Sequence, residues 1–281
     1  MIAATFLVAA PDQPGLVARL AGYFYERGLN IVDAGNHSDP GVAPPRFFMR
    51  LVVDLGAAPR DELERGFARL VSALRATYSV GYSDVLPRLA ILVTKEASCL
   101  YDLILRQRSG ELRCELPLVA SNHGALESVA SSFGIPFYTL PVTAETKLTQ
   151  EARLLALLRQ ERVGLVVLAR YMQVLSEGFL AQAPPVINIH HGFLPAFQGA
   201  RPYQQAHARG VKMIGATAHY ATADLDQGPI IEQDVARVTH QMGPEELARV
   251  GRDVERVVLA RAVRAHLERR ILVEGRRTIV L

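Results

Sequence analysis

The segment VGLVVLA, residues 163–169, contains no polar or charged side chain. A half-buried strand alternates apolar with polar residues, whereas a strand covered on both faces is apolar throughout. This segment is therefore predicted to be a buried strand of a sheet with helices on both sides. Similar strands are expected at residues 89–94 (LAILVT) and 116–121 (LPLVAS), with helical patterns between them. The predicted fold of this part of the chain is a doubly wound, mostly parallel α/β sheet.

The remaining elements of this α/β region follow outward from these strands. Further strands are expected at residues 135–140 and 186–190, and helices at residues 98–108, 124–133, 149–161, 176–182 and 244–269. Residues 213–220 and 229–235 are expected to extend the sheet with antiparallel strands. Together these elements define one domain, residues 87–281.

The first 86 residues show a different pattern. The expected order is strand 5–10, helix 16–28, strands 30–36 and 46–54, helix 61–77 and strand 80–85. This β-α-β-β-α-β order is the ferredoxin-like arrangement. In the first helix, Leu16, Leu20, Phe24 and Tyr25 are expected to form the buried face. With a linker at residues 86–88, the chain is predicted to have two domains, 1–86 and 87–281.

Composition restricts the class of protein. Hydrophobic residues make up 49% and charged residues 21% of the 281 residues, which is typical of a globular protein and not of a disordered chain. The formal net charge of +3 is too small to predict a nucleic-acid partner. Only two cysteines are present, and the sequence has neither a CxxC pair nor an apolar run long enough to span a membrane. We therefore expect a cytoplasmic protein with no nucleic-acid or membrane partner.

The segment PVINIHHGFLPAFQ, residues 185–198, places two polar groups on a buried strand. Residues two apart on a strand point to the same side, so Asn188 and His190 are expected side by side. Ligands of doubly wound sheets bind beyond the carboxyl ends of the strands, where both residues lie. The downstream loop TADLDQGP adds the carboxylate of Asp226. Amide, imidazole and carboxylate suit attack on an acyl carbon, as oxyanion donor, proton shuttle and orienting group.

Other histidines nearby leave alternatives open. His191 is expected to point to the opposite face of the strand and to have a structural role. His219 is expected to line the same cleft as Asp226, as a supporting group. A zinc site is a weaker alternative, because adjacent histidines on a strand diverge and no HExxH pattern occurs. The sequence also lacks a GxSxG elbow, a GxxxxGK[ST] phosphate loop and a GxGxxG motif, which leaves acyl or one-carbon chemistry.

Nearly the whole chain resembles the folate-dependent enzymes of the formyltransferase fold, and most closely the formyltetrahydrofolate deformylases. The resemblance is carried by the segments PDQPGLVARL, RFFMR, ILVTKEASCL, SNHGALES, LARYMQVLS, NIHHGFLPAFQGARPYQQA, GATAHYATADLDQGPIIEQDV, GRDVERVVLARAV and RRTIVL. It implies an N-terminal ACT domain that binds an amino-acid effector and supports a homo-oligomer. It also implies a second domain that hydrolyses 10-formyltetrahydrofolate to formate and tetrahydrofolate without a cofactor or a metal. The implied metabolic role is to supply formate for purine synthesis and to balance the one-carbon folate pool.

The resemblance assigns roles to individual residues of the second domain. The catalytic asparagine, histidine and aspartate of these enzymes match Asn188, His190 and Asp226. The segment that contacts folate through its backbone matches Met172, Gln173, Val174 and Leu175. The catalytic assignment agrees with the roles inferred above from chemistry alone.

This chain differs from related formyltransferases at two positions, and the resemblance also implies a regulatory site. Related formyltransferases often carry serine at the position of Gly192 and arginine at the position of Gln173. These differences remove a hydroxyl near the formyl group and a side-chain contact to folate. In the ACT domain, Asp12, Gly15 and Asn30 are the expected effector-binding residues.

Residues 94–99 (TKEASC) bear on the choice between a hydrolase and a transferase. Formyltransferases that act on a phosphorylated amine resemble one another in a glycine-rich loop at this place, where backbone N–H groups bind the phosphate. Here the loop has no glycine, and Glu96 would repel a phosphate. Water is therefore the predicted nucleophile. A formyltransferase, a metallohydrolase and a non-enzymatic amino-acid sensor are the competing classes.

Overall fold

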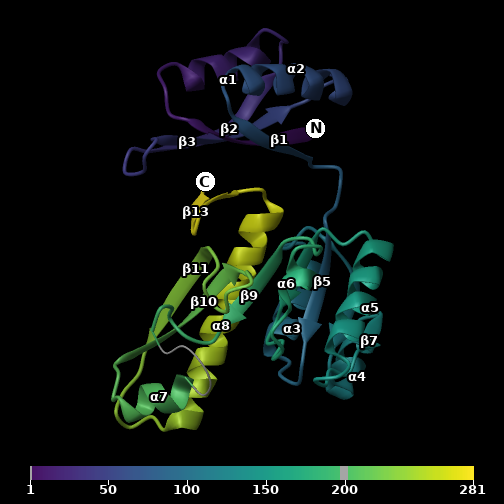
Figure 1. The fold of residues 1–281 in the computed structure, drawn as a ribbon, viewed down its shortest axis with the longest axis vertical. Helices are drawn as coiled ribbons and strands as arrows, with labels where there is room; N and C mark the ends of the chain where they lie inside the picture. The colour runs from purple at the N-terminus through teal and green to yellow at the C-terminus, as the bar shows by residue number, and fades with distance from the viewer. Residues whose placement is uncertain (1, 197–201) are drawn as a thin grey trace. The chain divides into compact units, whose positions relative to one another are not determined.

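The computed structural model describes residues 2–196 and 202–281, so residues 197–201 of the segment that follows His191 lie outside the described part. The chain divides into two compact units. The first unit comprises Met1–Leu86, Glu268–Glu274 and Thr278–Leu281, and the second comprises Pro87–Leu267 and Gly275–Arg277. Figure 1 shows the elements within each unit.

The first unit contains a four-stranded antiparallel sheet with strand order β2-β3-β1-β4. Its strands and helices are β1 (Ala3–Pro11), α1 (Leu16–Tyr25), β2 (Asn30–Asp39), β3 (Arg46–Asp54), α2 (Arg60–Ala73) and β4 (Thr77–Tyr82). Both helices lie on the same side of the sheet (Figure 1). The predicted ferredoxin-like order is confirmed.

Aromatic rings fill the core between this sheet and its helices. Phe6 of β1, Phe24 of α1 and Phe67 of α2 are fully buried, with ring centroids 4.6 to 5.4 Å apart. The expectation for Tyr25 is wrong, because its side chain is 84% exposed. Tyr23 is buried instead, since spacings of three, four and seven residues place it on the same stripe as the other apolar residues of α1.

The second helix of this unit is shorter than predicted. It ends at Ala73, and Thr77, expected to be its last residue, begins β4. Arg75 lies between them with a φ of 53°, a left-handed conformation that no α-helix can contain. The sequence offers no glycine at this position to mark the helix end.

A C-terminal hairpin, which was not predicted, covers the other face of this sheet. It consists of β12 (Ile271–Glu274) and β13 (Arg277–Val280). Leu272 of the hairpin is buried with Leu7 of β1 and Phe48 of β3. The residues on either side of Leu7 and Phe48 in these strands face the helices. Both faces of β1 are therefore covered, which explains its continuous apolar sequence.

The second unit contains a seven-stranded sheet with strand order β11-β10-β9-β8-β5-β6-β7. The parallel strands are β5 (Arg88–Val93), β6 (Glu115–Ser121), β7 (Phe137–Thr139), β8 (Leu165–Leu168) and β9 (Val186–His190). Two antiparallel strands extend it, β10 (Met213–Tyr220) and β11 (Ile230–Arg237). All four residues of β8 are buried. The predicted mostly parallel α/β sheet is confirmed, including its antiparallel extension.

The helices of this unit are α3 (Ser98–Arg108), α4 (Glu127–Ser132), α5 (Lys147–Gln160), α6 (Glu177–Leu180), α7 (Pro202–Ala208) and α8 (Pro244–Leu267), with a 3-10 turn η1 (Gly124–Leu126) before α4. Leucines of α5 and Phe179 of α6 pack on alternate residues of β5, β6 and β8. Helix α8 packs along β9, β10 and β11 and against α3. Helix α7 was not predicted. No helix in the described part of the chain is long and apolar enough to cross a membrane.

The order of the parallel strands reverses at β5. Strands β6 and β7 continue the sheet on one side of β5, and β8 and β9 continue it on the other. Ligands of such sheets bind outside the carboxyl ends of the strands near this reversal. The segment that follows β8 carries Met172, Gln173, Val174 and Leu175, and the carboxyl end of β9 carries Asn188 and His190.

Candidate active site

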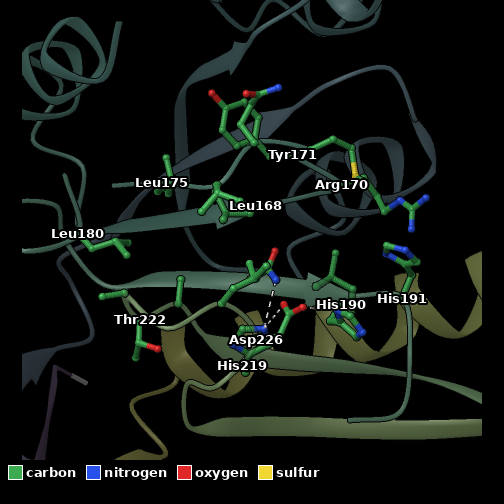
Figure 2. A pocket seen from close by; sticks show the side chains of 18 residues that line it. Leu168, Arg170, Tyr171, Leu175, Leu180, His190, His191, His219, Thr222 and Asp226 are labelled. Carbon is green, nitrogen blue, oxygen red and sulfur yellow. Dashed lines mark hydrogen bonds and ion pairs between the residues drawn. The ribbon is translucent and has the colours of Figure 1, made fainter. Parts of the chain in front are cut away.

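Strand β9 and the loop after β10 bring the three predicted catalytic residues together (Figure 2). Asn188 and His190 lie on the same side of β9 and line one cavity with Asp226. Nδ1 of His190 lies 3.1 Å from Oδ2 of Asp226. Nε2 of His190 is buried and has no hydrogen-bond partner among the described residues. With Nδ1–H donating to the carboxylate, Nε2 is the atom through which His190 can exchange a proton with a ligand.

His219 of β10 connects the amide to the carboxylate. Its Nδ1 lies 2.9 Å from the carbonyl oxygen of Tyr220, which can only accept, so this nitrogen carries a proton. Its Nε2 lies 3.2 Å from Nδ2 of Asn188 and 3.6 Å from Oδ1 of Asp226. In the neutral form, Nε2 therefore accepts one N–H of Asn188 and leaves the second N–H for a ligand. The structure places His219 in the cleft, as expected.

The loop that carries Asp226 has an unusual backbone. Asp226 has a φ of 56°, a left-handed conformation that aspartate and asparagine tolerate better than most residues. Two residues later, a Cβ on Gly228 would lie 1.7 Å from the carbonyl oxygen of Tyr220. Only glycine permits this close approach of the loop to β10. The Gly-Pro pair of the sequence thus holds the carboxylate against the two histidines.

The surroundings of Asp226 keep it ionised. The contacts with His190, and then with His219, lower the pKa of its carboxyl group well below the usual range. Its side chain is only 12% exposed, so these interactions act with little screening by solvent. A permanent negative charge next to His190 favours the protonated imidazole during a reaction.

A cavity of about 500 Å³ opens beside these residues. The predicted folate-binding residues all line it: Met172, Gln173, Val174 and Leu175. Leu168, Leu180 and Leu225 add apolar surface. Its size and its mixture of apolar walls with a few polar groups are typical of a site for a small organic ligand.

The segment between β8 and α6 is held by polar contacts that sequence reasoning missed. The backbone N–H of Met172 donates to Oγ1 of Thr94 at 3.0 Å, and this hydroxyl donates to Oδ1 of Asn122 at 2.7 Å. The buried carboxylate of Glu151 accepts from the backbone N–H of Ser176 at 2.9 Å. Single threonine and glutamate residues distant in sequence gave no signal of this role. They fix the loop that lines the cavity.

The expected direction of the His191 side chain is wrong. Its side chain lines the same cavity and stacks on His190, with ring centroids 5.3 Å apart and ring planes at 20°. Alternation fails because β9 ends at His190, so the next residue no longer follows the pleat of the strand. Burial, the guanidinium of Arg170 and the neighbouring His190 lower the pKa of His191 to about 4. Within the described residues, no group of three or more potential metal ligands is arranged as a metal site.

The low pKa of His191 predicts how stability depends on pH. The unfolded chain binds this proton near pH 6.5 and the folded chain only near pH 4, so the free energy of unfolding falls as pH drops through this window. Between pH 7.5 and 4.5, the free energy of unfolding of His191→Gln is expected to fall by roughly 2 kcal/mol less than that of the unsubstituted protein. Urea unfolding at both pH values measures this. His240→Gln, at an exposed histidine, is the control, and equal losses in both variants would contradict the prediction.

The expected effector residues lie in the first unit. Asp12 follows β1, and its backbone N–H donates to the carbonyl oxygen of Pro45 at 2.9 Å. Gly15 precedes α1 with a φ of 85°, and Asn30 begins β2. All three residues are exposed.

Comparison with known proteins extends this picture. The formyl transferase family matches residues 87–263. Over 281 residues, a formyltetrahydrofolate deformylase of Synechocystis is 54% identical, with 99% of this chain and 98% of the relative covered. The crystal structure of a formyltetrahydrofolate deformylase from Pseudomonas syringae pv. tomato is 40% identical, has a TM-score of 0.95 and covers 100% of this chain and 95% of its own.

A transferase structure aligns over a smaller part of the chain. Glycinamide ribonucleotide transformylase 1 of Symbiobacterium toebii is 29% identical, with a TM-score of 0.66, and 71% of this chain and 96% of the relative are covered. The deformylases, by contrast, match both units of the chain from end to end. The resemblance inferred from the sequence is confirmed, and the chain belongs to the formyltetrahydrofolate deformylase family.

Proposed function

We propose that this protein hydrolyses 10-formyltetrahydrofolate to formate and tetrahydrofolate. The observation that carries the proposal is the contact of His190 with Asp226 beside Asn188, at the wall of a cavity of about 500 Å³. Membership of the deformylase family supports the choice of substrate. The apolar part of the cavity, lined by the residues between β8 and α6, suits the pterin.

The catalytic roles follow from the positions of the polar atoms. The N–H of Asn188 that is not used by His219 donates to the formyl oxygen as negative charge develops there. Nε2 of His190, which has no partner among the described residues, passes a proton to the folate nitrogen as the C–N bond breaks. Asp226 orients the imidazole through Nδ1 and stabilises its protonated form. His219 and the 172–175 segment contribute to substrate binding.

Water is favoured over an amine as the nucleophile by the start of α3. Oε1 of Glu96 accepts the backbone N–H of Ser98 at 3.0 Å, and Oε2 accepts its hydroxyl at 2.6 Å. A helix N-terminus is where a phosphate commonly binds. The carboxylate of Glu96 already occupies these donors and repels a second anion, which argues against a phosphorylated acceptor.

The test is an assay of the purified protein with 10-formyltetrahydrofolate and EDTA, in the absence of any amine. Equal amounts of formate and tetrahydrofolate are expected. Formate release that EDTA abolishes and added zinc restores would favour a metallohydrolase. Formyl transfer to an added amine without formate release would favour a transferase.

The Asn188→Ala variant is expected to lower kcat by about 10²–10³-fold with little change in KM. The amide contributes mainly as charge develops on the formyl oxygen, so its loss raises the barrier more than it weakens ground-state binding. Steady-state kinetics of formate release measure both constants. Asn36→Ala, at an exposed position of β2, is the matched control. A rise in KM at unchanged kcat would assign Asn188 to binding instead.

A second proposal concerns the first unit, which would have a regulatory role. We infer that an amino acid binds at Asp12, Gly15 and Asn30 in a homo-oligomer and modulates the hydrolase. Strand β2 is an edge strand of its sheet with most residues exposed, which leaves it available for pairing between subunits. Calorimetric titration with glycine and methionine tests the effector, and light scattering tests the oligomer. The absence of heat with every amino acid would mean that the unit is purely structural.

The metabolic role follows from the proposed activity: the formate released would be supplied to purine synthesis.

A further inference from the structure

His191 is an imidazole at the cavity wall that the proposed mechanism does not use. Its ring stacks on His190 and lies 6.2 Å from the ring of Tyr203, centroid to centroid. The contacts of its side chain are ring contacts, and neither nitrogen has a hydrogen-bond partner within residues 2–196 and 202–281. The ring is half-buried and lines the cavity. A polar group so placed is available to a molecule in the cavity.

The backbone next to His191 is fixed by buried side chains. Thr217 of β10 is fully buried; its hydroxyl donates to the carbonyl oxygen of Gly192 at 2.9 Å and accepts from the N–H of Leu194 at 3.0 Å. Nε2 of Gln233 donates to the carbonyl oxygen of Leu194 at 3.0 Å and to Oγ1 of Thr217 at 2.9 Å. Two side chains of neighbouring strands thus hold the turn after β9. The imidazole is therefore preorganised rather than a mobile loop side chain.

Burial, and then Arg170, set the charge of this imidazole. It lines the same cavity, and Figure 2 shows its guanidinium group pointing toward His191. Its Nη1 lies 3.3 Å from Oε2 of Glu255, a fully buried residue of α8 that also accepts the hydroxyl of Tyr203 at 2.6 Å. The cation is thus held in place. Burial and this cation keep His191 neutral at neutral pH, and a neutral imidazole has one lone pair that accepts a hydrogen bond.

Three other polar groups of the cavity already have roles in the proposed mechanism. Asn188 contacts His219 and, in the proposed mechanism, donates to the formyl oxygen. His190 contacts Asp226 and gives its proton to the folate nitrogen. Both oxygens of Asp226 face histidines. The nucleophile needs an acceptor for its O–H bond, so that a lone pair of its oxygen points at the formyl carbon. His191 stands next to His190, with such an acceptor and no other partner in the described structure. We propose that His191 holds the nucleophilic water in its attacking position.

This inference rests on the proposed function and balances as follows. The water oxygen bonds to the formyl carbon, and the electron pair of the C=O bond moves to the oxygen that Asn188 binds. The C–N bond then breaks, and the folate nitrogen keeps the electron pair and takes a proton from His190. A proton lost by the water restores the one that His190 gave up, and the formic acid released ionises to formate.

The experiment compares His191→Phe with the unsubstituted protein, using steady-state formate release. Phenylalanine keeps the stacked ring but has no nitrogen. We expect kcat to fall about 100-fold, with KM for 10-formyltetrahydrofolate changed less than about threefold. His191→Gln, which restores a hydrogen-bond acceptor, should recover part of the loss and serves also if the phenylalanine variant does not fold. His240→Phe, at an exposed histidine, should leave both constants unchanged.

Hydroxylamine provides a readout that packing alone does not move. It attacks the formyl carbon to give formohydroxamate, with the same proton passing to the folate nitrogen. In His191→Phe, the ratio of formohydroxamate to formate should rise, because hydroxylamine is the stronger nucleophile and depends less than water on a group that positions it. An unchanged ratio, or a kcat within about threefold of the unsubstituted protein, overturns the inference. If the unsubstituted protein releases no formate at all, the proposed function fails and not this inference alone.

Discussion

Replacing Asp226 by asparagine is expected to lower kcat by about 10⁴-fold while the protein stays folded. The carboxylate receives Nδ1–H of His190 and lies 3.6 Å from Nε2 of His219, and it stays ionised because these contacts lower its pKa. A neutral amide keeps the shape of the side chain but no longer stabilises a protonated imidazole. It also presents an N–H where His190 needs an acceptor, which favours the wrong tautomer. Initial rates of formate release measure the loss.

The backbone conformation at residue 226 accommodates asparagine, so the substitution changes the charge of the side chain without straining the loop. Asp226 has a φ of 56°, and asparagine adopts this conformation as readily as aspartate, so the loop gains no new strain. Asp224→Asn is the matched control, because Asp224 is exposed in the same loop and does not line the cavity. Circular dichroism melts of both variants establish that the fold is retained. An Asp226→Asn variant with more than about a tenth of the original rate, roughly 1.4 kcal/mol of barrier, would show that the assignment is wrong.

The sequence predicted the central part of the candidate site because strand geometry is regular. Asn188 and His190 lie two residues apart within β9, so their common direction follows from the period of a strand. The same rule failed one residue later, at His191, because the strand ends there and no local signal marks its last residue. The contact of Asp226 with both histidines required the fold of a distant loop. Its residue type and the family resemblance pointed to Asp226, and the structure supplies its contacts.

The fold shows the same division between local and non-local signals. The apolar run at residues 163–169, which contains β8, and long helices such as α8 were predicted, because each carries its own pattern. The C-terminal hairpin was missed, since its two strands have four residues each and are stabilised by packing on Leu7 and Phe48. Glu255 was also missed. It lies in an arginine- and glutamate-rich helix in which a fully buried carboxylate looks like its solvent-exposed neighbours.

Replacing Arg170 by methionine is expected to destabilise the protein by about 3–5 kcal/mol, because Glu255 would have to keep its buried charge without a cation or take up a proton. Burial already raises the pKa of Glu255, and Arg170 is the main group that opposes this effect. The surroundings leave little freedom to adjust, since a Cβ on Gly251 of α8 would lie 2.0 Å from the hydroxyl oxygen of Tyr203. Urea unfolding at pH 7.5 measures the change in the free energy of unfolding.

A double-mutant cycle separates the ion pair from the backbone. Arg170 has a φ of 63°, and methionine retains a Cβ there, so the substitution leaves the strain in place and removes only the charge. Arg162→Met is the control, because Arg162 is exposed and has a φ of 49°; we expect it to change stability by less than about 0.5 kcal/mol. Adding Glu255→Gln to Arg170→Met removes the uncompensated charge and should recover most of the stability. Additive losses in the double variant would mean that the two residues act independently, and the pair would then not be what holds Arg170 beside the cavity.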